Sequence, residues 1–121
     1  MAEAMTMMRS NVGVAVMDGQ LFAIGGYNCK ERLNTVELYD SRLKCWHKVT
    51  SMYNRRSAVG AAPLNGLLYV CGGYDGSTSL NAVERYSPIE DQWELVTGMI
   101  FHRSAAGVVA LDGYIYVVGG M

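Results

Sequence analysis

The sequence repeats itself every 47 residues, without an insertion or a deletion. Gly25-Gly26 recurs as Gly72-Gly73 and Gly119-Gly120, and Trp46 recurs as Trp93. A repeat of this length indicates a stack of one supersecondary unit, in which neighbouring copies bury each other's apolar faces. We therefore expect the functional surface to be built from several units together.

Each unit is expected to form four short strands. In the second unit these are 57–64, 67–71, 81–86 and a fourth strand that contains Trp93 and Val96. Asn65-Gly66 lies between the first two strands and predicts a type I′ hairpin turn, since both residues readily adopt positive φ. No segment has the 3.6-residue periodicity of a helix, so the predicted fold class is all-β. Pro63 cannot donate a hydrogen bond to a sheet, and we expect a local irregularity there.

Composition restricts the classes of function. Ten basic and eleven acidic side chains leave a net charge of −1, which disfavours a nucleic-acid or membrane-surface role based on bulk charge. No apolar run is long enough to cross a bilayer, and residues 1–10 lack the apolar region of a signal peptide. Cys29, Cys45 and Cys71 have neither a C-x-x-C pair nor the spacing of zinc ligands. We therefore expect a reducing, cytoplasmic environment, with no cofactor and no metal.

Several motifs recur in register: Arg-Ser-x-x-Gly, Asn/Asp-Gly, Gly-Gly-Tyr, Leu-Asn-x-Val-Glu-x-Tyr and Trp. Together they resemble the kelch repeat over practically the whole chain, and most of all the kelch-like proteins that join a BTB domain to a six-bladed propeller. The resemblance implies a β-propeller fragment with two complete four-stranded antiparallel blades and the first hairpin of a third. Its expected parts are the end of a preceding fourth strand at 1–5, blade one at 6–52, blade two at 53–99 and half of blade three at 100–121.

A fragment with cut blade boundaries leaves strand edges and a blade surface uncovered. We therefore expect the isolated chain to be unstable or to self-associate.

In an antiparallel meander, the connection from a fourth strand to the next first strand shares one face with the loop between the second and third strands. We call this the loop face, and we call the opposite face, with the two kinds of hairpin turn, the turn face. Six basic residues stand against three acidic ones on the loop face, which predicts an acidic or phosphorylated peptide as partner. The basic residues are Arg9, Lys30, Arg32, Arg55, Arg56 and Arg103, and the acidic ones are Glu3, Glu31 and Asp75.

The resemblance implies the same face, because partner peptides of kelch-like proteins lie over the central opening and contact recurring positions. In this sequence those positions are Arg9, Ser10, Arg56, Ser57, Arg103 and Ser104 at the first strands, Tyr27 and Tyr74 after the double glycines, and Arg32 and Ser79 five residues further on. Met121 stands where a third tyrosine is expected.

Some of these positions have a second interpretation. An arginine at a fixed phase of the repeat is also compatible with a structural bridge between neighbouring blades, and the recurring Glu37 and Glu84 are expected to pair structurally. Arg32 departs from the repeat, since Ser79 takes its place, and is less constrained by the fold. Residues 28–32 differ from 75–79 at almost every position. This difference is compatible with a loop that recognises a specific partner and equally with neutral drift of a surface loop.

We expect a non-catalytic protein-interaction module. The resemblance implies either the substrate-recognition propeller of a cullin-based ubiquitin ligase adaptor, recruited through a BTB domain that this chain does not contain, or an actin-binding cytoskeletal scaffold. Some kelch propellers carry copper oxidase chemistry. Here His47 and His102 differ in phase and neither has a second histidine nearby, which argues against a copper site.

Overall fold

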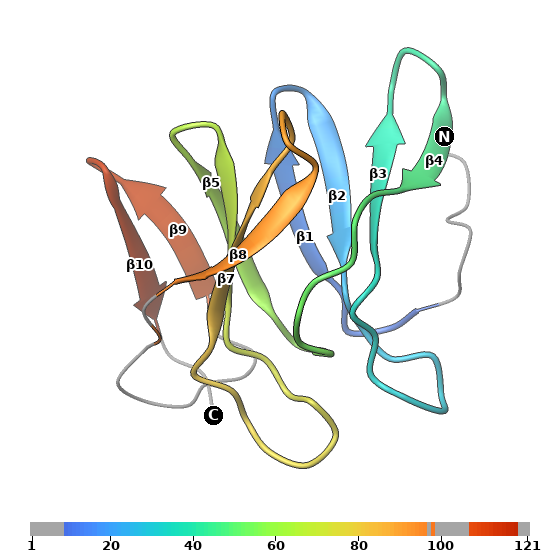
Figure 1. The fold of residues 1–121 in the computed structure, drawn as a ribbon, viewed down its shortest axis with the longest axis vertical. Coiled ribbons are helices and arrows are strands. Elements are labelled where there is room, and N and C mark those ends of the chain that lie inside the picture. The colour runs from blue at the N-terminus through green and yellow to red at the C-terminus, as the bar shows by residue number, and fades with distance from the viewer. Residues whose placement is uncertain (1–8, 97, 99–106, 119–121) are drawn as a thin grey trace.

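The computed structural model describes residues 9–96, 98 and 107–118. Antiparallel strands are the regular secondary structure of these residues, and loops and turns connect them (Figure 1). Blade one is a sheet in the order β1-β2-β3-β4, blade two is a sheet in the order β5-β6-β7-β8, and β9 and β10 form a hairpin. The strands are β1 Gly13–Met17, β2 Gln20–Ile24, β3 Val36–Asp40, β4 Cys45–Lys48, β5 Gly60–Leu64, β6 Leu67–Cys71, β7 Val83–Ser87, β8 Gln92–Val96, β9 Gly107–Leu111 and β10 Tyr114–Val118. The predicted fold class is confirmed.

The turns between first and second strands follow from two-residue sequence signals. Asp18 and Gly19 have φ angles of 52° and 75°, and Asn65 and Gly66 have 53° and 76°. Two consecutive positive φ angles define the type I′ turn, whose twist matches that of the flanking strands. The third hairpin repeats this geometry with Asp112 at 52°.

The first strand of each blade begins later than predicted. The expected first strand of the second unit starts at residue 57, and residue 11 is the start of its counterpart in the first unit, whereas β5 starts at Gly60 and β1 at Gly13. The reason lies in the backbone, since Asn11 and Ala58 have φ angles of 52° and 53° and turn the chain before the regular ladder begins.

The irregularity expected at Pro63 is absent, because the register of β5 with β6 runs unbroken from Gly60↔Cys71 to Leu64↔Leu67. In an antiparallel pair, hydrogen-bonded and non-hydrogen-bonded positions alternate, and Leu64↔Leu67 closes the two-residue turn as a hydrogen-bonded pair. Pro63↔Leu68 is then a non-hydrogen-bonded pair, so the proline nitrogen points to the open side of β5.

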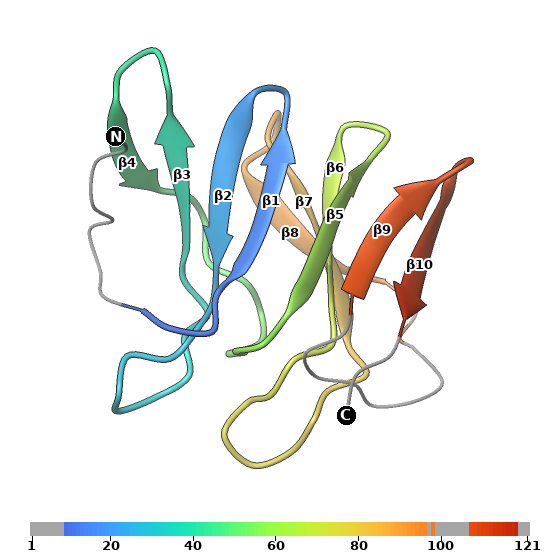
Figure 2. The same ribbon diagram turned by 180° about the vertical axis from the view of Figure 1, so that it is seen from behind.

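The core lies between the two blades. Phe22 of β2 and Tyr86 of β7 meet edge to face, with ring centroids 6.1 Å apart. Ile24, Leu68 and Val70 are fully buried in the same cluster. The first strands β1, β5 and β9 lie side by side, as Figure 2 shows from behind. Stacking of neighbouring units therefore creates the core, as the 47-residue period predicts.

The fourth strand of blade two is tied to the end of blade one. The Trp93 indole N–H donates to the Thr50 carbonyl oxygen at 2.7 Å, and the Thr50 N–H donates to Asp91 Oδ1 at 3.1 Å. The same carboxylate accepts the Tyr86 hydroxyl at 2.6 Å, which holds the pKa of Asp91 below its usual range. Within the described residues there is no helix that could span a membrane.

Candidate functional site

Backbone pairing brings six of the predicted contact residues together on the loop face. Ser10 forms an isolated bridge with Tyr27, and Tyr27 forms a second one with Arg32. Blade two repeats the arrangement with Ser57, Tyr74 and Ser79. The start of each first strand is thus held beside the loop between the second and third strands, as the meander argument predicts, at the lower edge in Figure 1.

The double glycine allows this close approach. Gly25 has a φ of 63°, and a Cβ atom at this position would collide with the Arg56 carbonyl oxygen of the next blade. The Gly26 N–H donates to that same oxygen at 2.9 Å, and the Arg56 N–H donates to the Leu33 carbonyl at 3.0 Å. The loop of blade one and the first strand of blade two are therefore bound main chain to main chain.

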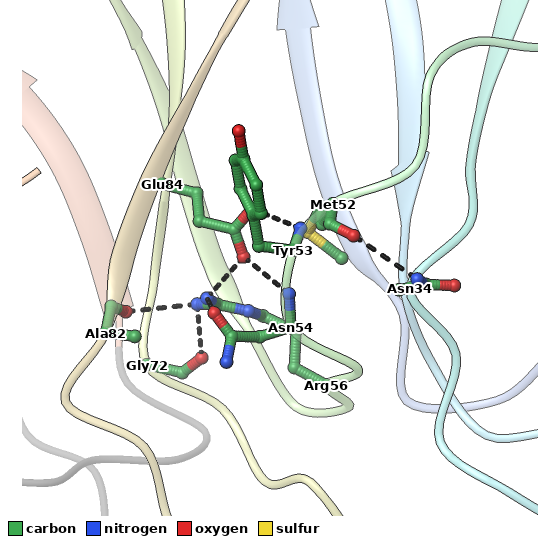
Figure 3. A network of polar contacts seen from close by, with 8 residues as sticks. All are labelled: Asn34, Met52, Tyr53, Asn54, Arg56, Gly72, Ala82 and Glu84. Atoms are coloured by element: carbon green, nitrogen blue, oxygen red, sulfur yellow. Dashed lines mark hydrogen bonds and ion pairs between the residues drawn. The ribbon is translucent and has the colours of Figure 1, made fainter. Parts of the chain in front are cut away.

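The side chains of Arg9 and Arg56 point into the protein. The Arg56 side chain is fully buried and pairs with Glu84 at 2.7 Å, and Arg9 pairs with Glu37 at 2.9 Å with both side chains fully buried. Arg56 also donates to the carbonyl oxygens of Gly72 at 2.8 Å and Ala82 at 3.1 Å (Figure 3). Burial lowers the pKa of the Arg56 guanidinium, and the Glu84 carboxylate opposes this shift. The recurring Glu37 and Glu84 form the structural pairs that the sequence predicts.

Glu84 also organises the connection between the blades. Its two carboxylate oxygens accept the N–H groups of Tyr53 at 2.7 Å and Asn54 at 3.0 Å, so one buried carboxylate receives the guanidinium and two main-chain donors (Figure 3). The Arg56–Glu84 pair lies within blade two, not between blades, and it fixes the incoming chain onto its own blade. The bridge between neighbouring blades at this point comes from the main chain of Arg56.

Arg32 provides a side-chain contact between the blades. Its guanidinium carbon lies 4.2 Å from the centroid of the Tyr27 ring in blade one and 5.0 Å from that of the Tyr74 ring in blade two. Its Nε–H donates to Ser57 Oγ at 3.4 Å. Cation–π contacts of this kind stabilise by about 0.5–2 kcal/mol. Although Arg32 breaks the repeat, the structure places it in a contact between blades.

Arg55 and Glu31 support the Arg32 loop, and they were not among the predicted contact residues. Arg55 lies 3.4 Å from Glu31, with side chains 52% and 57% exposed, and donates to the Arg32 carbonyl oxygen at 3.3 Å. The opposite charges of these two residues on the same face are the signal that could have identified them.

A small cavity lies beside this cluster on blade one. It has a volume of about 200 Å³ and is lined by Arg9, Ser10, Tyr27, Asn28 and Cys29. Ser10 and Cys29 are exposed, and Tyr27 is half-buried. Among the described residues, no three His, Cys, Asp or Glu side chains come close enough to hold a metal ion.

The charge of the loop face is smaller than the sequence count. Arg9 and Arg56 are buried against glutamates, and Arg103, Ser104 and Glu3 lie outside the described residues. Lys30, Arg32 and Arg55 then stand against Glu31 and Asp75 as the accessible charges, an excess of one positive charge. The predicted preference for acidic partners then rests on Lys30 and Arg32, because Arg55 is paired with Glu31. Partner contact by the predicted positions stays a prediction.

Comparison with known proteins shows which family has this repeat. The Kelch motif matches three times, at residues 8–53, 55–100 and 102–121. The chain belongs to the Kelch motif family. The resemblance found in the sequence is thus confirmed, and so is the interpretation as a protein-interaction propeller module.

Curated relatives match a short segment. Over 44 residues the chain is 48% identical to the influenza virus NS1A-binding protein homolog B of Danio rerio and to the influenza virus NS1A-binding protein homolog of Mus musculus. It is 46% identical to the influenza virus NS1A-binding protein of Homo sapiens over the same length. Each match covers 36% of this chain and 7% of the relative.

Proposed function

We propose that this chain binds a protein or peptide segment on its loop face, with Arg32, Tyr27 and Tyr74 as the central contacts. The observation that carries the proposal is the position of the Arg32 guanidinium between two tyrosine rings of neighbouring blades. Within the described part of the chain, only its Nε–H has a hydrogen-bond acceptor, so both terminal amino groups remain free to donate.

This arrangement favours a carboxylate in the partner. Two terminal amino groups of a guanidinium form a planar fork that matches the two oxygens of a carboxylate. Contact with both rings restricts the side chain before the partner arrives, which reduces the entropy lost on binding. An acidic peptide side chain is the class of ligand that fits, and a phosphorylated side chain offers the same pair of acceptors.

The test begins with peptides selected by display on the chain itself. Their affinity is then measured for Arg32→Ser and for Arg42→Ser, which makes the same change on the exposed turn face. Serine stands at this phase in blade two as Ser79, so the fold accommodates it. We expect at least about a tenfold weaker affinity for Arg32→Ser, equivalent to about 1.4 kcal/mol, and no change for Arg42→Ser. Equal binding by both variants would place the peptides elsewhere.

We further propose substrate recognition for a ubiquitin ligase as the role of this surface in a longer protein that supplies the cullin-binding part. The support is the family resemblance, together with relatives whose names describe binding to a viral protein. Co-purification of a cullin with the full-length protein would test this role. Co-sedimentation of the propeller with filamentous actin would instead favour the cytoskeletal role.

A further inference from the structure

The hairpins between third and fourth strands have the same backbone in both blades and opposite charge. Residue 44 in blade one and residue 91 in blade two are the equivalent turn positions, with φ angles of 55° and 52°. The first is Lys44 and the second is Asp91. The same turn backbone therefore accepts either charge at this phase. The Asp91 carboxylate also accepts the Tyr86 hydroxyl and the Thr50 N–H, so the acidic charge that is open to a partner comes mainly from Glu90 and Glu94.

The inversion extends along both hairpins. Residues 40–48, the basic hairpin, contain Arg42, Lys44 and Lys48 against Asp40. Residues 87–95, the acidic hairpin, contain three acidic side chains, Glu90, Asp91 and Glu94, and no basic one. With histidine neutral, the basic hairpin has a net charge of +2 and the acidic hairpin −3.

The charged side chains on both hairpins are available to a partner. Arg42, Lys44 and Lys48 are exposed, and their side chains form no hydrogen bond or ion pair with any other described residue. The same holds for the Glu90 carboxylate. Glu94 is bound to Arg85 at 2.8 Å but remains 62% exposed. Each tip also carries an exposed aliphatic side chain, Leu43 at 69% and Ile89 at 97%.

The two hairpins also share a position in the fold. β4 and β8 are the last strands of their sheets, and both hairpin turns lie on the turn face, at the top in Figure 1. One side of each outer strand therefore has no neighbouring strand among the described residues. Within the described part of the chain, no ion pair joins the basic hairpin to the acidic one, so the two charges do not neutralise each other inside the molecule.

We infer that the basic hairpin of one copy of this chain docks on the acidic hairpin of a second copy. The argument rests on charge complementarity, on the equal shape of the two hairpins and on their accessible outer strands. Contacts between two different patches are heterologous, so each copy at the end of an assembly still offers one free hairpin. Short linear oligomers can therefore form. The turn face is opposite to the loop face, and docking there leaves Arg32 and its neighbours accessible.

The first experiment measures self-association at two ionic strengths. Electrostatic screening lengths fall from about 30 Å at 0.01 M salt to about 8 Å at 0.15 M. We expect sedimentation velocity to show association of the wild-type chain at the lower salt, with an apparent Kd at least about tenfold weaker at the higher salt. A monomer at low salt, or association that does not change with salt, would overturn the inference. The second result would point to contacts between apolar blade faces.

Two reciprocal variants test the pairing itself. Arg42→Glu/Lys44→Asp makes both hairpins acidic and places in blade one the residue type that Asp91 has in blade two. Glu90→Lys/Glu94→Lys makes both hairpins basic. Neither variant alone should associate, whereas an equimolar mixture should recover the wild-type association, because a basic hairpin again meets an acidic one.

Controls separate docking from loss of structure and from peptide binding. Both variants must retain the wild-type circular dichroism and urea midpoint, and the recovery in the mixture shows directly that each is folded. Arg32→Ser should associate like the wild type. Association of either variant alone at the wild-type level, or two folded variants that fail to associate when mixed, would refute the docking of unlike hairpins.

Discussion

The Arg56 guanidinium stabilises blade two, and the connection that enters it, through its pair with Glu84, and Arg56→Met isolates that contribution. The substitution keeps most of the apolar stem and removes the guanidinium. Glu84 then loses its partner at 2.7 Å but keeps the main-chain N–H groups of Tyr53 and Asn54. The carbonyl oxygen of Gly72 loses the Arg56 donor.

The magnitude follows from the burial of the pair. Both side chains are fully buried, and removing one partner of such a pair costs about 3–5 kcal/mol, because the other charge stays buried without compensation. The N–H groups that remain on Glu84 favour the lower half of this range. If the free energy of unfolding falls by about 2 kcal/mol per M urea, the unfolding midpoint of Arg56→Met should lie about 2 M below that of the wild type.

The assay is equilibrium unfolding in urea followed by tryptophan fluorescence, to which the buried Trp93 and the partly buried Trp46 both contribute. Arg55→Met is the matched control, since Arg55 is the preceding residue and its pair with Glu31 is exposed to water. Exposed pairs contribute little, so the control should unfold near the wild-type midpoint. Adding Glu84→Gln to Arg56→Met should recover about 0.5–3 kcal/mol, because the unpaired charge is removed. Equal midpoints for Arg55→Met and Arg56→Met would refute a stabilising ion pair.

Three further predictions concern other parts of the fold. Burial raises the pKa of the Cys71 thiol to about 11, so iodoacetamide at pH 8 should label exposed Cys29 in the native chain and Cys71 only after unfolding, as mass spectrometry would show. Tyr86→Phe should cost about 1.5 kcal/mol in urea unfolding. The folded pKa of Asp91 lies below its ordinary value of 3.8. The stability that the Asp91 carboxylate contributes is therefore complete above that pH and is lost as pH falls through the lower folded pKa. This loss of stability in acid should be smaller in Tyr86→Phe. Gly25→Ala should destabilise the chain strongly, whereas an unchanged midpoint would contradict the close main-chain contact.

Short-range signals predicted the strands well. The second strand of blade two matches the expected range 67–71, and the Asn65-Gly66 turn has the expected positive φ angles, because these features depend on two to five consecutive residues. The errors are local as well. Pro63 fits because it occupies a non-hydrogen-bonded position, which depends on the pairing with β6 and not on proline itself.

The candidate site was harder to predict than the strands. The sequence leaves Arg9 and Arg56 open between partner contact and a structural bridge, whereas in the structure each meets a glutamate 28 positions further along the chain and is buried there. Arg32 departs from the repeat and gives no sign of a structural partner, yet it reaches a tyrosine of the next blade. Which side chains are accessible depends on how the blades stack.

By itself, the sequence determined the repeating unit, its four strands, its tight turns and the face on which the loops gather. These follow from periodicity and from the φ preferences of a few residues, which act over short distances. Only the tertiary structure decided that two recurring arginines are buried ion-pair partners and that Arg32 lies between tyrosines of neighbouring blades. The physical reason is that a charged side chain responds to whatever group lies within a few ångströms, and in a stacked repeat that group comes from a distant strand or from the next blade.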